Sequence, residues 1–395
     1  MKVLLVHNHY QSSSPSGEDV VFEAEKNLLS ENGIEVVTYV RRNDGIINFN
    51  LFKQANLAFN NIWSKESYKE IMKIIKRVKP DIAHFHNIWY LISPSAYYAC
   101  KNYSIPVVQT LHNFRFFCLN GLLLRNGKVC TDCIGALPWR GIIFKCFRGS
   151  FAYSAALGLV IIFHHLRKTF LKTIDGYIAL TEFNKKLFVR AGLPENKIYV
   201  KPNFFQDLGN NSKQDENYAI YLGRISEEKG VRILVEAWGK IKRFKLLIIG
   251  DGPKRKKCEE LALKEKIKNI EFLGFQPRRK VLELIKSASF LIIPSLCYET
   301  FGMTIGEAFS AGKPVVGSNL GNIAEIIKHG ETGLLFRPRD PDDLAEKIQW
   351  MIDNPKERQR MGENAYQEYL EKYTPEKNFK MLMEIYEDVL NKTKK

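Results

Sequence analysis

Short apolar runs alternate with segments of helical spacing along the whole chain, and this alternation constrains the fold more than any other feature. The run Leu246-Leu247-Ile248-Ile249 is continuous, as expected of a strand buried on both faces of a parallel sheet. Apolar runs predict strands over residues 2–6, 35–40, 82–85, 106–111, 177–180, 198–200, 218–222, 244–249, 270–272, 290–293 and 314–316. Helical spacing marks residues 17–32, 65–79, 229–240, 252–264, 277–287, 340–353, 356–372 and 375–390. The prediction is an α/β protein with two doubly wound, Rossmann-like parallel sheets.

The length of 395 residues allows two domains. We place the boundary near Pro202-Asn203, ahead of the polar stretch 206–216. The predicted N-terminal domain covers 1–203 and the C-terminal domain 204–374, with 375–395 packing back on the first. Two facing domains of this kind bind ligands at the carboxyl ends of their strands, so the functional residues are expected in the loops that follow them.

The formal net charge of +16 lies mostly in the first half of the chain. Residues 1–203 carry 26 Lys and Arg against 14 Asp and Glu, whereas residues 204–395 carry 33 against 29. This excess indicates an anionic partner for the first domain, such as lipid headgroups, a lipid pyrophosphate or nucleic acid. Basic clusters such as 254–257 lack interleaved aromatic residues, so no nucleic-acid partner is expected.

The N-terminus and the apolar stretches bear on location. No small-residue cleavage site follows the apolar run after Met1, and the seven cysteines are an odd number, so a cytoplasmic protein with reduced thiols is expected. The longest apolar stretch, 151–163, is shorter than the roughly 20 residues that span a bilayer. Two interpretations of 151–172 remain open, a buried helix of the first domain or a contact with the inner face of the plasma membrane.

Two carboxylates, Glu299 and Glu307, stand eight positions apart around a turn that opens a helix. The turn follows the apolar strand 290–293, and the first N–H groups of the helix form an anion site. Gly302 and Gly306 remove side-chain bulk where a phosphate would come close. A phosphate site between two hydroxyl-binding carboxylates describes a nucleotide-sugar pocket.

A second loop, 223–230, follows the strand over 218–222 and carries Arg224 and Lys229. A guanidinium can bind a diphosphate with two parallel hydrogen bonds, and an ammonium adds a mobile point charge. Together with the stretches 250–253, 272–275, 294–316, 321–325 and 330–335, this loop resembles the retaining glycosyltransferases of glycosyltransferase family 4, which have the two-domain GT-B fold. The resemblance covers nearly the whole chain and is densest over 218–345.

The resemblance implies a role for each matching residue. Arg224 and Lys229 would bind the diphosphate and stabilise the leaving group, Glu307 would hold the ribose, and Glu299 would contact the donor sugar. The remaining residues implied to bind the donor are Gly17, Asn203, Gly223, Gly250, Phe275, Phe301, Gly302 and Met303. His112 would lie near the donor sugar and join Glu299, Lys229 and Arg224 as a catalytic residue.

Three features have competing interpretations. The loop 12–18 has one glycine where the family commonly has two, so Gly17 could equally belong to an ordinary strand-to-helix turn. His84 and His86 lie on the same face of a strand, so they could bind a metal ion together. The interpretation we favour is a hydrogen-bonded structural pair. Asp340-Pro341-Asp342 is read as a helix cap, and no metal is expected in catalysis.

The cysteines of the insert 120–145 are the least settled feature. Cys130 and Cys133 have zinc-knuckle spacing, and Cys118 and Cys146 could complete a structural zinc site. The alternative is four thiols without a metal.

The expected function is the transfer of a hexose-type sugar from a nucleotide diphosphate sugar to a carbohydrate or lipid-linked saccharide acceptor, in bacterial cell-surface polysaccharide biosynthesis. No cofactor is expected in catalysis. Alternatives are a sugar-nucleotide epimerase or a phosphorylase of the same fold, and a basic nucleic-acid-binding protein.

Overall fold

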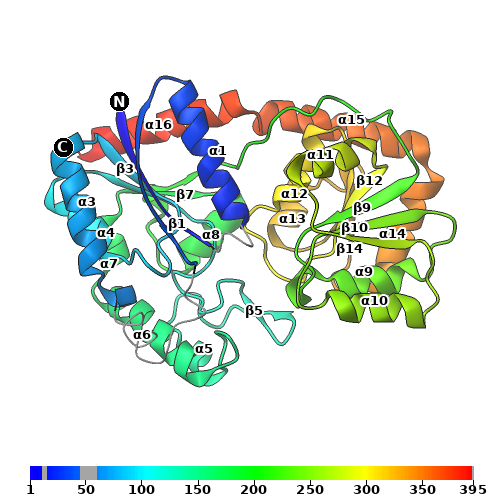
Figure 1. The fold of residues 1–395 in the computed structure, drawn as a ribbon, viewed down its shortest axis with the longest axis horizontal. Coiled ribbons are helices and arrows are strands. Elements are labelled where there is room, and N and C mark those ends of the chain that lie inside the picture. Colours follow the sequence, from blue (N-terminus) through cyan, green and yellow to red (C-terminus); the bar gives the residue numbers. More distant parts are fainter. Residues whose placement is uncertain (11–15, 45–59, 394–395) are drawn as a thin grey trace. The chain divides into compact units, whose positions relative to one another are not determined.

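The computed structural model describes residues 1–10, 16–44 and 60–393, and contacts divide the chain into two compact units (Figure 1). The first unit comprises Met1–Leu122, Thr131–Lys201 and the chain from Phe379 onward. The second comprises Leu123–Cys130 and Pro202–Asn378. The boundary after Lys201 lies two residues before the expected one, and the last helix joins the first unit at Phe379 rather than at 375. The grouping of Leu123–Cys130 with the second unit was not foreseen.

The first unit contains a parallel sheet with strand order β2-β1-β3-β4-β7-β8. Its strands are β1 (Lys2–His9), β2 (Glu35–Arg42), β3 (Ile82–Phe85), β4 (Val107–Thr110), β7 (Gly176–Ala179) and β8 (Ile198–Val200). Its helices are α1 (Gly17–Glu31), α3 (Lys65–Val78), α4 (Ser95–Asn102), α5 (Trp139–Ile143), α6 (Phe151–Leu166), α7 (Thr169–Thr173) and α8 (Glu182–Arg190), with a 3₁₀ turn at Glu195–Lys197.

Two helices from opposite ends of the chain cover one face of this sheet. Phe22 and Leu29 of α1 pack with Leu382 and Tyr386 of α16 (Pro375–Thr393) over Val3 and other core residues of the strands. These side chains are almost completely buried, so α16 is part of the core of the first unit. The last helix therefore packs on the first sheet, as expected from the sequence.

The second unit contains a parallel sheet with strand order β11-β10-β9-β12-β13-β14. Its strands are β9 (Tyr218–Leu222), β10 (Lys245–Ile249), β11 (Ile270–Gly274), β12 (Phe290–Ile293), β13 (Val315–Ser318) and β14 (Gly333–Phe336). Its helices are α9 (Val231–Trp238), α10 (Arg255–Lys264), α11 (Arg278–Ser287), α12 (Met303–Ser310), α13 (Gly321–Ile326), α14 (Pro341–Asp353) and α15 (Pro355–Lys372), with a 3₁₀ turn at Glu227–Lys229. Helices α9, α10 and α14 pack side by side, as do α11, α12 and α15 (Figure 1).

The expected strands are all present, each within three residues of its predicted bounds. Strand β14 and the antiparallel hairpin of β5 (Leu124–Arg125) and β6 (Lys128–Val129) were not predicted. Asp340 caps α14 by accepting hydrogen bonds from the N–H groups of Asp342 and Asp343, with Pro341 in the first turn. The interpretation of this Asp-Pro-Asp segment as a helix cap is therefore confirmed.

Candidate active site

The strand order of the second sheet defines where a ligand would bind. Strands β9 and β12 are neighbours, but β10 and β11 lie on one side of them and β13 and β14 on the other. The chain therefore reverses its direction of winding between β9 and β12. In open parallel sheets, ligands bind outside the carboxyl ends of the strands at such a point of reversal.

The loop after β9 packs directly on the loop after β12. Gly230 has φ +68°, and a Cβ atom there would come 1.9 Å from the carbonyl oxygen of Pro294. The N–H of Leu296 donates a hydrogen bond of 2.8 Å to the carbonyl oxygen of Glu228. A residue with a side chain would push the two loops apart, so glycine at 230 holds them in contact.

Lys229 and Glu299 meet across these loops, as the sequence predicted for residues of one site. Lys229 Nζ lies 2.7 Å from Glu299 Oε1, and Ser295 Oγ donates to the same oxygen at 2.6 Å. Burial favours the neutral forms, but the opposite charge and the hydrogen bonds prevail, so the pKa of Lys229 is raised and the pKa of Glu299 is lowered from its ordinary value. Both groups are therefore charged at neutral pH.

Arg224 supplies a second cation in the loop after β9. Its side chain is exposed, and no carboxylate of the described residues lies within salt-bridge distance of it. Gly223, at φ +149°, precedes it and lies against Gly250, where a Cβ would come 2.0 Å from the Gly223 carbonyl oxygen. The two glycines thus bring the ends of β9 and β10 together, and the guanidinium remains available to an anion.

Helix α12 begins after the loop that follows β12 and has no side-chain cap. Its N-cap is Gly302 at φ +81°, which has no side chain to accept hydrogen bonds from the first N–H groups. Met303 is the first helical residue, and the ring of Phe301 is buried against Phe205 with a centroid separation of 5.9 Å. The backbone of this turn, rather than the Phe301 ring, is what an anion could contact.

Gly306 has a different role from the one expected. A Cβ atom at this position would lie 2.0 Å from the ring of Phe205. The absence of a side chain therefore accommodates an aromatic ring of the core, and the expectation that Gly306 makes room for a phosphate is wrong.

Glu307 lies on α12 with an unused hydrogen-bond acceptor. Its side chain is buried; Arg278 Nη1 donates to Oε1, whereas Oε2 has no hydrogen-bond partner among the described residues. Burial raises the pKa of Glu307 against the opposing charge of Arg278. An unsatisfied buried oxygen is costly, and a hydroxyl of a ligand would satisfy it.

Asn203 and Phe275 complete the predicted donor-binding set in this unit. Asn203 Nδ2 donates to Met303 Sδ at 3.2 Å, and its Oδ1 is buried without a partner among the described residues. Phe275 follows β11, and 77% of its side chain is exposed. Such a ring is available to lie beside a planar base.

Three histidines of the first unit, His84, His86 and His112, form a buried network with Glu25. His84 Nδ1 and His86 Nε2 lie 3.0 and 3.1 Å from Glu25 Oε1, and Lys201 Nζ lies 3.0 Å from Oε2. His84 Nε2 also meets the Thr110 hydroxyl at 2.7 Å. His84 and His86 are thus both hydrogen-bonded, as the favoured interpretation expected, and the choice between this and a metal site stays untested.

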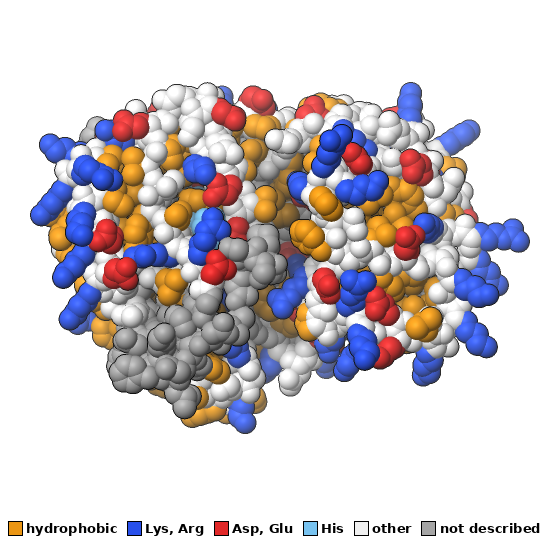
Figure 2. Space-filling model, in the orientation of Figure 1, with side chains coloured by type: hydrophobic (Ala, Val, Ile, Leu, Met, Phe, Trp, Pro, Cys, Tyr) orange, Lys and Arg blue, Asp and Glu red, His pale blue; other side chains and the backbone are white. Residues whose placement is uncertain are grey.

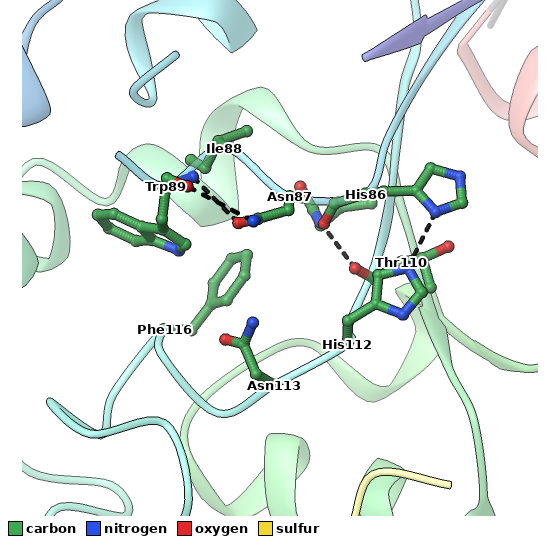
Figure 3. A pocket seen from close by; sticks show the side chains of 9 residues that line it. His86, Asn87, Ile88, Trp89, Thr110, His112, Asn113 and Phe116 are labelled. Carbon is green, nitrogen blue, oxygen red and sulfur yellow. Dashed lines mark hydrogen bonds between the residues drawn. The ribbon is translucent and has the colours of Figure 1, made fainter. Parts of the chain in front are cut away.

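This network fixes the proton positions of His86 and His112, which lie 2.9 Å apart through Nδ1 and Nε2 (Figure 3). Burial raises the pKa of Glu25, but Lys201 and the histidines outweigh it and hold the pKa well below its ordinary value. Burial lowers the pKa of His86 to about 4 and that of His112 well below its usual range. The ionised Glu25 accepts from His86 Nε2, so the neutral His86 accepts at Nδ1 and His112 donates from Nε2.

A small pocket lies beside this pair at the carboxyl ends of β3 and β4. Its lining includes His86, Asn87, Trp89, His112 and Asn113 (Figure 3). His112 thus lies at the edge of a pocket, as its predicted role requires, and its place relative to a donor sugar stays a prediction.

Gly17 is the first residue of α1. Ser16 caps this helix, with its hydroxyl accepting from the N–H of Asp19 and the Asp19 carboxylate accepting from the N–H of Ser16. Beside Gly17, Glu18 Oε1 accepts from Asn113 Nδ2 at 2.9 Å, and Glu18 Oε2 is buried without a partner among the described residues. Residues 12–15 of the predicted loop lie outside the described residues, so the contact of Gly17 with a phosphate remains a prediction.

Among the described residues, two groups of side chains could hold a metal ion. They are His7, His9 and Asp19, and Glu25, His84 and His86, each with ligand atoms within 4.8 Å of one another. Asp19 already caps α1 and accepts from His7 Nε2 at 2.8 Å, and the second group forms the network described above. Neither group contains Cys118, Cys130, Cys133 or Cys146, and a structural zinc at these cysteines stays a prediction.

Sequence reasoning missed four residues of these sites. Arg278 lies 29 positions from Glu307, and Glu25 lies 176 positions from Lys201, so no local pattern joins them. Glu18 follows Gly17 directly, and its position at the start of a helix was the only available signal.

Comparison with known proteins agrees with this arrangement. The family model described as "Glycosyltransferase Family 4" matches residues 18–206, and that described as "Glycosyl transferases group 1" matches residues 203–368. An uncharacterized glycosyltransferase of Methanocaldococcus jannaschii is 28% identical over 347 residues, which are 86% of this chain and 93% of the relative. The N-acetyl-alpha-D-glucosaminyl L-malate synthase of Bacillus anthracis is 30% identical over 54% of this chain and 57% of its own.

Two solved structures share the fold at low sequence identity. The structure of HepE of Anabaena in complex with UDP has a TM-score of 0.67 at 17% identity, covering 98% of this chain and 100% of its own. The sucrose-phosphate synthase of Thermosynechococcus elongatus has a TM-score of 0.73 at 16% identity, covering 99% of both chains. The two family models together with this fold show that the chain belongs to glycosyltransferase family 4 and is a glycosyltransferase with the GT-B fold.

Proposed function

We propose that this enzyme moves a hexose-type sugar from a nucleoside diphosphate sugar to a saccharide or lipid-linked saccharide acceptor, with retention of the anomeric configuration. The setting we propose is the assembly of a bacterial cell-surface polysaccharide on the cytoplasmic side of the plasma membrane. One observation carries the donor assignment. Around the carboxyl ends of β9 and β12, cations, uncapped N–H groups and unsatisfied buried oxygens lie on adjacent elements.

These groups match the parts of a nucleoside diphosphate sugar. Arg224 and Lys229 carry positive charge beside the open start of α12, which suits a diphosphate. Glu307 Oε2 can accept from a ribose hydroxyl, and the exposed ring of Phe275 can lie against the base. Uridine is the first base to test, because HepE of Anabaena was solved with UDP and with UDP-glucose.

The proposed chemistry follows from the same charges. The bond between the anomeric carbon and the phosphate oxygen breaks, and the negative charge that develops on the phosphate is stabilised by Lys229, Arg224 and the amides of α12. The leaving phosphate oxygen takes the proton of the acceptor hydroxyl, whose oxygen bonds to the anomeric carbon on the same face of the sugar. Fixed cations supply the positive charge, so we propose that catalysis needs no metal.

Two measurements test this proposal. UDP release from UDP-sugars should rise only when an acceptor saccharide is added, and NMR of the product should show the anomeric configuration of the donor. Sugar release to inorganic phosphate would indicate a phosphorylase, and conversion of the donor without an acceptor would indicate an epimerase. Either result would overturn the transfer reaction proposed here.

A structural zinc at the cysteines of the insert is tested separately. If the insert holds a structural zinc, metal analysis of the purified protein finds one zinc per chain and chelation lowers the melting temperature; four thiols without a metal are the alternative. Substoichiometric zinc with an unchanged melting temperature would reject the site.

A further inference from the structure

Helix α6 is apolar on every side, but only one side is buried. Leu157, Ile161 and their neighbours are buried within the first unit. On the opposite side, Leu159, Phe163 and Leu166 are 56%, 37% and 70% exposed. An α-helix that is hydrophobic all round is normally buried in a core or in a membrane. Neither interpretation drawn from the sequence accounts for this helix alone, because it has both a buried face and an exposed apolar face.

Helix α5 extends the exposed apolar area. The two helices pack side by side, since a Cβ atom at Gly158 of α6 would lie 2.6 Å from Ile142 of α5 (Figure 1). Trp139 and Ile143 are 53% and 66% exposed. Of the eighteen large hydrophobic side chains that are exposed among the described residues, nine lie within residues 139–171. Exposed apolar side chains gathered in one patch usually mark an interaction site.

The same segment is strongly basic. Residues 133–174 contain no Asp or Glu, and their six basic residues are Arg140, Lys145, Arg148, Arg167, Lys168 and Lys172. Among the described residues, only Arg140 of these six pairs with a carboxylate, that of Asp132 at 3.6 Å. In the part of the α5 and α6 end of the first unit that Figure 2 shows in colour, hydrophobic side chains lie beside Lys and Arg side chains.

The cations lie directly against the exposed aromatic rings. The guanidinium of Arg167 lies 5.4 Å from the ring centroid of Phe163, and that of Arg148 lies 5.5 Å from the ring centroid of Tyr153. Apolar side chains and cations therefore share one surface, which we call the α5–α6 surface and define as the exposed side chains of residues 139–172.

We propose that the α5–α6 surface docks on a membrane that contains anionic phospholipids. Leu159, Phe163 and Leu166 would enter the boundary between headgroups and acyl chains, and the surrounding cations would bind lipid phosphates. Among the described residues no helix is long and apolar enough to cross a membrane, so the contact we propose is with one leaflet. A second copy of this chain is the less suitable occupant, because it would bring six cations against six cations without carboxylates between them.

Vesicle sedimentation with the full chain tests this proposal directly. At low salt the protein should bind vesicles of phosphatidylcholine mixed with phosphatidylglycerol and should not bind vesicles of phosphatidylcholine alone. Leu159→Glu with Leu166→Glu should abolish binding, and the triple change Arg167→Gln, Lys168→Gln and Lys172→Gln should weaken it about fivefold for each cation removed. Leu263→Glu is the matched control, because this side chain is 78% exposed on α10, and its binding should equal that of the wild type.

The outcomes separate the proposal from its alternatives and from the transferase function. Failure of the wild type to bind anionic vesicles, or equal binding by the Leu159→Glu and Leu166→Glu variant, would overturn it. Dimerisation in sedimentation velocity that the same variant abolishes, without vesicle binding, would assign the surface to a second copy. The variants of the α5–α6 surface should bind UDP as the wild type does. A wrong nucleotide assignment would therefore show in UDP binding, and a wrong membrane assignment would show in vesicle binding.

Discussion

The ribose contact of Glu307 gives the sharpest test of the proposed donor site. One oxygen of this carboxylate accepts from Arg278, and the other is buried without a partner among the described residues. Glu307→Gln keeps the size of the side chain but replaces one acceptor oxygen with an NH₂ group. A hydrogen bond to a charged acceptor contributes about 1.5–3 kcal/mol, so the dissociation constant for UDP should rise about 10- to 150-fold.

Folding should survive this change. Burial raises the pKa of Glu307, which means that the charged form is disfavoured by its surroundings. A neutral amide of the same shape therefore removes that penalty together with the ion pair to the partly exposed Arg278. The free energy of unfolding in urea should change by less than about 1 kcal/mol.

Isothermal titration calorimetry with modified nucleotides completes the test. The wild type should bind 2′-deoxy-UDP or 3′-deoxy-UDP about 10- to 150-fold more weakly than UDP, whereas Glu307→Gln should distinguish them little, since the partner of the missing hydroxyl is already lost. Glu283→Gln on α11 is the control, because its carboxylate pairs with the exposed Arg279 at 3.3 Å and should not affect UDP binding. An unchanged deoxy effect in Glu307→Gln would refute the ribose assignment.

Three further predictions concern loop packing, pH dependence and turnover. Gly230→Ala should lower the free energy of unfolding in urea by at least about 2 kcal/mol more than Gly33→Ala does. Both glycines have a positive φ, but only a Cβ atom at Gly230 would clash with its surroundings. Equal losses of unfolding free energy in the two variants would contradict this. The pKa of His86 is lowered from 6.5 to about 4 in the folded protein, so the unfolded state binds the proton first as the pH falls. The free energy of unfolding should therefore fall by about 3 kcal/mol between pH 6.5 and 4. His86→Gln should make the free energy of unfolding depend less on pH, and an unchanged slope would argue against this. Lys229→Ala should lower kcat about 10²- to 10³-fold in an assay of UDP release, with EDTA having no effect on the wild type; normal turnover would exclude Lys229 from leaving-group stabilisation.

The strands were predictable because most of them are buried on both faces. Continuous runs such as Leu246–Ile249 leave few alternatives in a chain where helical spacing separates them. The two-residue strands β5 and β6 carry no such signal, and β14 is a four-residue strand that begins with glycine. Helix α6 was ambiguous for a different reason. A segment that is apolar at nearly every position has no periodicity to show which side faces the core.

In the candidate site too, contacts between residues of predicted loops could be anticipated, whereas contacts with distant parts of the chain could not. The pairing of Lys229 with Glu299 could be anticipated because both belong to loops at strand ends. The partner of Glu307 could not, since Arg278 comes from the neighbouring helix α11 and is one of several basic residues there. The role of Gly306 was misjudged because the sequence does not show that Phe205 packs against it.

The two units use their buried polar side chains differently. In the first unit, His84, His86 and Lys201 are bound to one another through Glu25, so their hydrogen-bonding capacity is consumed inside the network. In the second unit, Glu307 keeps an unsatisfied oxygen and α12 keeps uncapped amides. A satisfied network gains nothing from a polar ligand, whereas unsatisfied buried groups become more stable when a ligand supplies the missing partners. This difference is a physical reason to propose that the nucleotide binds to the second unit and that His84, His86 and Lys201 support the first unit rigidly.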